Sequence, residues 1–66
     1  MEPLLSSLFR WCKKQMIKYP SLEEDIIDLY LLARDEIDDG ESVANECELA
    51  YNSVQELIED YTNAES

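Results

Sequence analysis

The stretch Asp38-Asp39-Gly40-Glu41-Ser42 separates two long segments whose apolar residues recur at helical spacing. Gly40 is the only glycine of the chain, and glycine is the residue that most readily ends a helix in the left-handed conformation. Ser42 is a favourable N-cap for the helix that follows. So short a connection predicts that the two helices are antiparallel neighbours in a helical hairpin.

The segment before this turn is predicted to be a helix over residues 22–39. Ser21 and Glu24 have the spacing of a capping box, in which each side chain satisfies a backbone N–H at a helix start. Apolar residues cover more than one side of this helix, which therefore should contact more than one neighbour. The main stripe consists of Leu22, Ile26, Leu29, Tyr30, Ala33 and Ile37, and a second ridge of Ile27 and Leu31, with Leu32 outside both.

The segment after the turn is predicted to be a helix over residues 43–62. Its apolar residues alternate steps of four and three positions, which is the spacing of a helix packed along one seam. The seam consists of Val43, Cys47, Ala50, Val54, Leu57 and Tyr61, and it is widened by Tyr51 and Ile58. Residues 63–66 are expected to form a loose tail.

A third helix is predicted over residues 3–18, starting at Pro3 and ending before Tyr19-Pro20. It is amphipathic, with a broad apolar arc on one side and a basic face on the other. The arc consists of Leu4, Leu5, Leu8, Phe9, Trp11, Cys12 and Met16, and the basic face of Arg10, Lys13, Lys14 and Lys18.

These three segments predict a single all-α domain, either a small three-helix bundle or a helical hairpin with the N-terminal amphipathic helix laid across it. No strand-like alternation is visible, and 66 residues leave room for one domain only. A core this small favours a homodimer as much as a monomer, because self-association buries more apolar area. The leucines left outside the monomer's seam are Leu31, Leu32 and Leu49.

The charge is strongly negative and unevenly distributed. Sixteen acidic residues stand against five basic ones, for a net charge of −11. Residues 1–19 carry a net charge of +3 and residues 20–66 carry −14. Direct binding of nucleic acid is not expected, because affinity for a polyanion depends on basic side chains. The 45% share of hydrophobic residues is nevertheless that of a folded protein.

Nothing in the sequence indicates an enzyme or a cofactor. The chain has no histidine, and Cys12 and Cys47 lie on apolar faces without a CxxC pattern. Both cysteines are expected to be buried thiols in a reducing cytoplasm. The chain also lacks a basic leader and an apolar run long enough to span a membrane, so a cytoplasmic location is expected.

A calcium loop is the sharpest metal motif to weigh. Asp35, Asp39, Gly40 and Glu46 fit positions one, five, six and twelve of an EF-hand. Ile37 stands at the third position, where an oxygen ligand is required. A helix end followed by a helix start explains the same residues more simply, and no metal site is assigned.

The basic N-terminal helix also has the composition of a helix that lies at a membrane surface, since Phe9 and Trp11 accompany its cationic face. Anionic lipid would repel the −14 of the remaining chain. The favoured interpretation is that its apolar arc packs on the other two helices, with Trp11 and Tyr61 as packing residues.

The acidic faces of the second and third helices are the main functional lead. Carboxylates four residues apart rise about 6 Å along a helix, which coarsely resembles the phosphate spacing of a nucleic-acid strand. We therefore expect a non-enzymatic binding protein that engages a basic surface of a nucleic-acid-handling protein and inhibits or modulates it, as a DNA or RNA mimic. The expected partner-binding residues are Glu24, Asp28, Asp35, Asp39, Glu48, Glu56, Glu59 and Asp60.

Two other interpretations remain open. The acids equally fit a solvated surface that keeps a small protein soluble, and the function would then be a self-associating structural module. Its contact would be an apolar ridge of Ile27, Leu31, Leu32 and Leu49. Small size and acidity also suit an accessory factor of the type made by phages and mobile elements, which is an analogy of type only.

Overall fold

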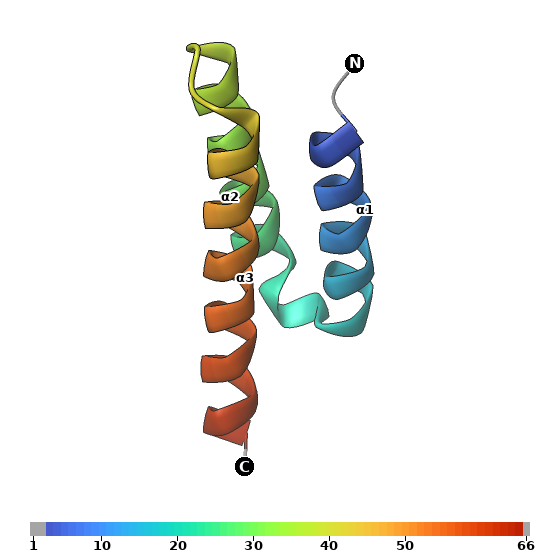
Figure 1. The fold of residues 1–66 in the computed structure, drawn as a ribbon. Coiled ribbons are helices and arrows are strands. Elements are labelled where there is room, and N and C mark those ends of the chain that lie inside the picture. Colours follow the sequence, from blue (N-terminus) through green and yellow to red (C-terminus); the bar gives the residue numbers. More distant parts are fainter. Residues whose placement is uncertain (1–2, 66) are drawn as a thin grey trace.

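The computed structural model describes residues 3–65, which form three packed helices and no strand. They are α1 (Pro3–Lys18), α2 (Glu23–Asp38) and α3 (Val43–Glu65), and a short 3-10 helix, η1 (Pro20–Leu22), joins the first two. Successive helices run antiparallel, and α3 continues past the η1 end of the bundle (Figure 1). The molecule is elongated, with extents of 40 × 16 × 15 Å. The predicted small all-α three-helix bundle is confirmed.

Each helix contributes one fully buried side chain to the centre of the core. These are Cys12 of α1, Ile26 of α2 and Val54 of α3, all with 0% exposure. The rest of the buried cluster comes from the three stripes predicted from the spacing, and it consists of Leu8, Leu22, Ala33, Cys47 and Ala50. Burial of these apolar surfaces is the main force that holds three short helices together.

Aromatic contacts tie the N-terminal helix and its connection to the other two. The ring of Phe9 lies 5.0 Å from that of Tyr30 of α2, measured between centroids. At the end of α1, the ring of Tyr19 meets that of Tyr61 of α3 edge to face at 5.9 Å. Most of the apolar arc of α1 therefore packs on the core, as expected, and its cationic side chains stay exposed. Leu4 and Phe9 are the exceptions, because they are 51% and 37% exposed.

The turn between α2 and α3 has the geometry predicted from Gly40, whose φ is +104°. Its N–H donates to the carbonyl oxygen of Ile37, and the N–H of Glu41 donates to that of Glu36, both at 3.0 Å. These two bonds form a Schellman motif. Ser42 caps α3 by accepting a hydrogen bond from the backbone N–H of Asn45 at 3.3 Å.

The predicted capping box at the start of α2 is wrong. Ser21 lies inside η1, α2 begins at Glu23 instead of residue 22, and no side chain makes a capping hydrogen bond there. The physical reason is a tight turn: Pro20 restricts the backbone, and the N–H of Leu22 donates to the carbonyl of Tyr19 at 2.9 Å. The buried side chain of Leu22 holds this turn against the core.

The ends of the hairpin helices also differ from the prediction. α2 ends at Asp38, one residue before the predicted end, because the cap starts at Asp39. α3 does not end at residue 62 but continues to Glu65, so the predicted loose tail is helical over residues 63–65, and Ser66 lies outside the described residues. Inside that last stretch, the hydroxyl of Thr62 donates to the carbonyl of Glu59 at 3.1 Å.

Candidate functional site

The eight carboxylates predicted to bind a partner are all exposed. They follow the outer sides of two helices: Glu24, Asp28, Asp35 and Asp39 on α2 and its end, and Glu48, Glu56, Glu59 and Asp60 on α3. At 100° per residue the α2 row occupies an arc of about 60° and the α3 row one of about 120°. Each row points away from the buried stripe of its own helix. The two rows therefore form separate ridges instead of one flat acidic surface.

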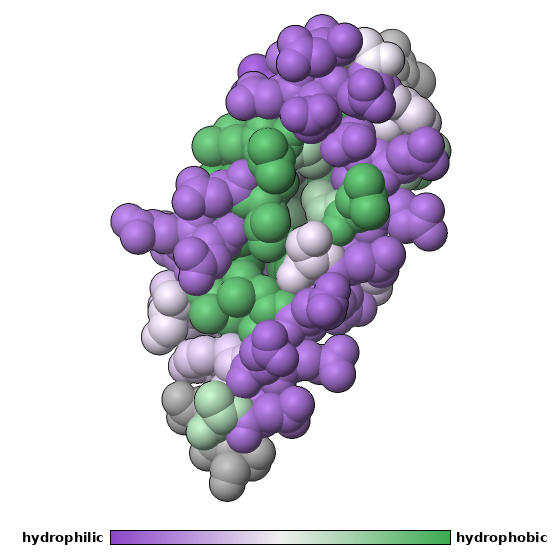
Figure 2. Space-filling view, turned by 90° about the vertical axis from the view of Figure 1, so that its left-hand side faces the viewer, coloured by the Kyte–Doolittle hydropathy of each residue, from purple (hydrophilic) through white to green (hydrophobic). Residues whose placement is uncertain are grey.

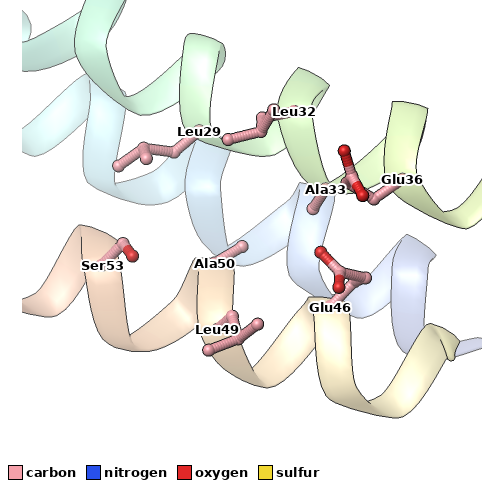
Figure 3. Close-up of a pocket in the computed structure, with 8 residues that line it drawn as sticks. All are labelled: Leu29, Leu32, Ala33, Glu36, Glu46, Leu49, Ala50 and Ser53. Atoms are coloured by element: carbon pink, nitrogen blue, oxygen red, sulfur yellow. The ribbon is translucent and has the colours of Figure 1, made fainter. Parts of the chain in front are cut away.

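A groove lies between α2 and α3, on the side of the bundle away from α1. Figure 2 shows this side as an apolar strip between two hydrophilic ridges. The groove has a volume of about 350 Å³. Its lining, drawn in Figure 3, consists of Leu29, Leu32, Ala33 and Glu36 from α2 and Glu46, Leu49, Ala50 and Ser53 from α3.

The floor and walls of the groove differ in character. Ala33 and Ala50 are buried and form a shallow floor of two methyl groups. Leu32 and Leu49 rise on either side and are 58% and 59% exposed. Exposed apolar side chains gathered around a hollow are typical of a contact surface.

Carboxylates stand at both ends of this apolar strip. On α2 the residues Asp25, Leu29, Leu32 and Glu36 follow one another by four, three and four positions, so they share one line along the helix. On α3 the corresponding line is Glu46, Leu49, Ser53 and Glu56. Because the helices are antiparallel, Glu36 and Glu46 lie at one end, where both line the groove, and the exposed Asp25 and Glu56 extend the lines at the other.

The structure brings together only part of the predicted apolar ridge. Leu32 and Leu49 line the groove. Leu31 is 43% exposed but lies 100° around α2 from Leu32, and both Leu31 and the half-buried Ile27 are outside the groove lining. The four residues therefore do not form one continuous surface.

The calcium-loop alternative does not fit the backbone. Asp35 belongs to α2 and Glu46 to α3, so only residues 39–42 connect the helices, whereas an EF-hand needs a loop of about twelve residues. Over residues 3–65, no group of three or more metal-ligating side chains is arranged to hold an ion.

The two cysteines lie in the core and offer no exposed nucleophile. Both are buried, and burial raises the pKa of the Cys12 thiol to about 11. The Cys12 thiol is therefore protonated at neutral pH. A second apolar hollow of about 480 Å³ lies near Cys47, between α1 and α3, and its lining includes Leu4, Trp11 and Tyr51.

Sequence reasoning missed Glu36, Ser53 and the role of Glu46 at the groove. The available signal was the register of the hairpin. In two antiparallel helices joined by a short turn, residues that face each other lie at similar distances in the sequence from the turn at Gly40, so their residue numbers add up to a nearly constant value. Applied to Glu36, that rule selects Glu46 as its partner across the groove.

None of the helices in the described part of the chain is both long enough and apolar enough to cross a membrane. Comparison of the chain with protein-family models, with curated proteins and with solved structures found no match.

Proposed function

We propose that this protein is a non-enzymatic acidic binding protein that engages a basic surface of a nucleic-acid-handling protein and inhibits or modulates it. The observation that carries the proposal is that all eight predicted carboxylates are exposed and lie in two ridges on α2 and α3. Like charges packed this densely repel one another and destabilise a small fold. A partner with a basic surface would relieve that repulsion.

The spacing of the ridges supports competition with nucleic acid. Within the ridges, three pairs of carboxylates are four residues apart, or about 6 Å along the helix axis: Glu24 and Asp28, Asp35 and Asp39, and Glu56 and Asp60. A basic groove that binds successive phosphates can accept such pairs. Association driven in this way should be fast and should weaken steeply as salt is added.

The test uses two variants with the same change in charge. The ridge variant carries Glu24→Gln, Asp28→Asn and Asp35→Asn, and the control variant carries Glu23→Gln, Asp38→Asn and Glu41→Gln. Partners captured at about 50 mM salt should be lost from the ridge variant, kept by the control, and released by added DNA or RNA. Capture that persists unchanged in molar salt, or that depends equally on both sets of acids, contradicts the proposal.

A second candidate function is a self-associating structural module, and the exposure of Leu32 and Leu49 on one groove favours it. In that case light scattering should show a dimer at micromolar concentration, and Leu32→Asp should abolish it. Neutralising Glu48, Glu56 and Glu59 should then have little effect on the mass measured.

A further inference from the structure

We propose that the groove between α2 and α3 docks an amphipathic helix of the partner protein, with apolar side chains in its middle and lysine or arginine at both ends. The inference rests on the proposed function, because it takes the partner to be basic. It adds the shape of the partner's binding element and the residues that receive it.

The dimensions of the groove suit two to three turns of helix. Leu29 and Glu36 are seven residues apart, so the lined part of α2 extends over about 10 Å. Asp25 and Glu36 are eleven residues apart, or about 16 Å, so they mark the distance expected between the cationic ends of the docked helix. A straight channel between two antiparallel helices accepts the ridge of a third helix.

The alanine floor explains how such a ridge can enter. Ala33 and Ala50 present only methyl groups, so an apolar side chain of the partner can descend between Leu32 and Leu49. Larger residues at either floor position would close the channel. The partner's apolar side chains would cover two leucine side chains that otherwise face water.

Charge decides which helix occupies the groove. Two copies of this chain meeting groove to groove would bring carboxylates at the ends of one groove against carboxylates of the other, because both ends of each groove are acidic, without a cation between them. The basic helix of a second copy is also unsuitable, because Leu8 and Cys12 of α1 are buried in its own core. A helix from a different, basic protein satisfies both the leucines and the carboxylates.

The test uses a designed peptide probe and the intact protein. The probe is an alanine-based helical peptide with lysines eleven positions apart and leucines four and seven positions after the first lysine, which complements the line from Asp25 to Glu36. A second peptide of the same composition places the leucines on the opposite face from the lysines. Fluorescence anisotropy at about 50 mM salt should show that the first peptide binds at least about tenfold more tightly than the second.

Matched variants locate the binding. Leu32→Ser with Leu49→Ser should weaken binding of the first peptide by about tenfold or more, whereas Leu31→Ser, which removes a leucine exposed outside the groove, should change it less than about twofold. Glu36→Gln with Glu46→Gln should weaken it several-fold at low salt and flatten its salt dependence. Equal affinity for the two peptides, or an equal loss in the Leu31→Ser variant, overturns the proposal.

The outcomes separate this inference from the proposed function. If the ridge variant loses its natural partner while Leu32→Ser with Leu49→Ser keeps both partner and peptide, the groove proposal fails and the electrostatic function stands. If the groove variants lose both the natural partner and the peptide, but nucleic acid never competes with the natural partner, the groove proposal stands and mimicry of nucleic acid fails.

Discussion

Trp11 of α1 and Tyr51 of α3 pack with their ring centroids 4.5 Å apart. Tyr51 is 40% exposed, so this contact lies at the edge of the bundle and not at its centre. On the other side of α1, Phe9 makes the corresponding contact with Tyr30 of α2. The N-terminal helix is thus held at two edges by aromatic pairs, in addition to its buried residues.

The pair of Trp11 and Tyr51 should show a measurable coupling. In a double-mutant cycle with Trp11→Leu and Tyr51→Leu, the interaction free energy should be about 0.5–1.5 kcal/mol. Urea unfolding followed by circular dichroism measures it. The matched cycle of Trp11→Leu with Tyr61→Leu should be additive, because Tyr61 packs on Tyr19 instead. Additivity in both cycles would show that the tilted contact of the Trp11 and Tyr51 rings contributes nothing beyond burial.

Gly40→Ala should destabilise the protein by about 1–2 kcal/mol, because φ is +104° at this position and an L residue is strained there. Apart from the adjacent residues, a Cβ at Gly40 meets no atom within 4 Å, so the loss comes from local backbone strain and not from a clash with the rest of the fold. Thermal unfolding measures it. A synthetic chain with D-alanine at this position has the favourable handedness and should be at least as stable as the original. Equal losses for both enantiomers would instead indicate a clash of the added methyl group with surrounding residues.

Cys12 should make stability fall at alkaline pH. Its pKa rises from 9.0 to about 11 on folding because burial disfavours the thiolate. The unfolded chain therefore loses this proton first as pH rises above 9. The contribution of the buried, protonated thiol to the free energy of unfolding is complete below pH 9 and is lost as pH rises through 11. The free energy of unfolding should fall by about 2–3 kcal/mol over this range. Chemical denaturation across this range should show a flatter profile for Cys12→Ala, and parallel profiles for the two proteins would contradict the assignment.

Added salt should stabilise the folded protein. The net charge of −11 and the exposed acidic ridges oppose folding, and screening weakens that repulsion. The melting temperature should rise between about 10 mM and 500 mM sodium chloride. The rise should be smaller for Glu24→Gln with Asp28→Asn and Asp35→Asn. A melting temperature independent of salt would mean that repulsion between the acidic side chains destabilises the fold very little.

The fold was predictable where the deciding signals are local. The core stripes of α2 and α3 follow from apolar spacing, and the turn between them follows from Gly40 and Ser42. The start of α2 was not predictable in this way, because Ser21 forms a capping box only if its own backbone has the non-helical angles of an N-cap residue. Pro20 and the burial of Leu22 impose a 3-10 turn instead.

The exposed acidic rows of the candidate site could be predicted from the sequence, but the groove between α2 and α3 could not. Exposure of the acidic rows follows from their position opposite each stripe. The groove depends on how α2 and α3 are aligned, which spacing within one helix does not contain. Leu31 and Leu32 illustrate the difference: they are adjacent in the sequence, yet only Leu32 reaches the groove.

The alanines of the groove floor belong at the same time to the hydrophobic core, where Ala33 and Ala50 pack among the buried residues. Any substitution that reshapes the floor to suit another ligand therefore also alters the interior packing. Recognition and folding stability share these two positions, so new binding preferences are expected to evolve through the rim residues, Leu32, Leu49, Glu36 and Glu46, while the floor is held constant.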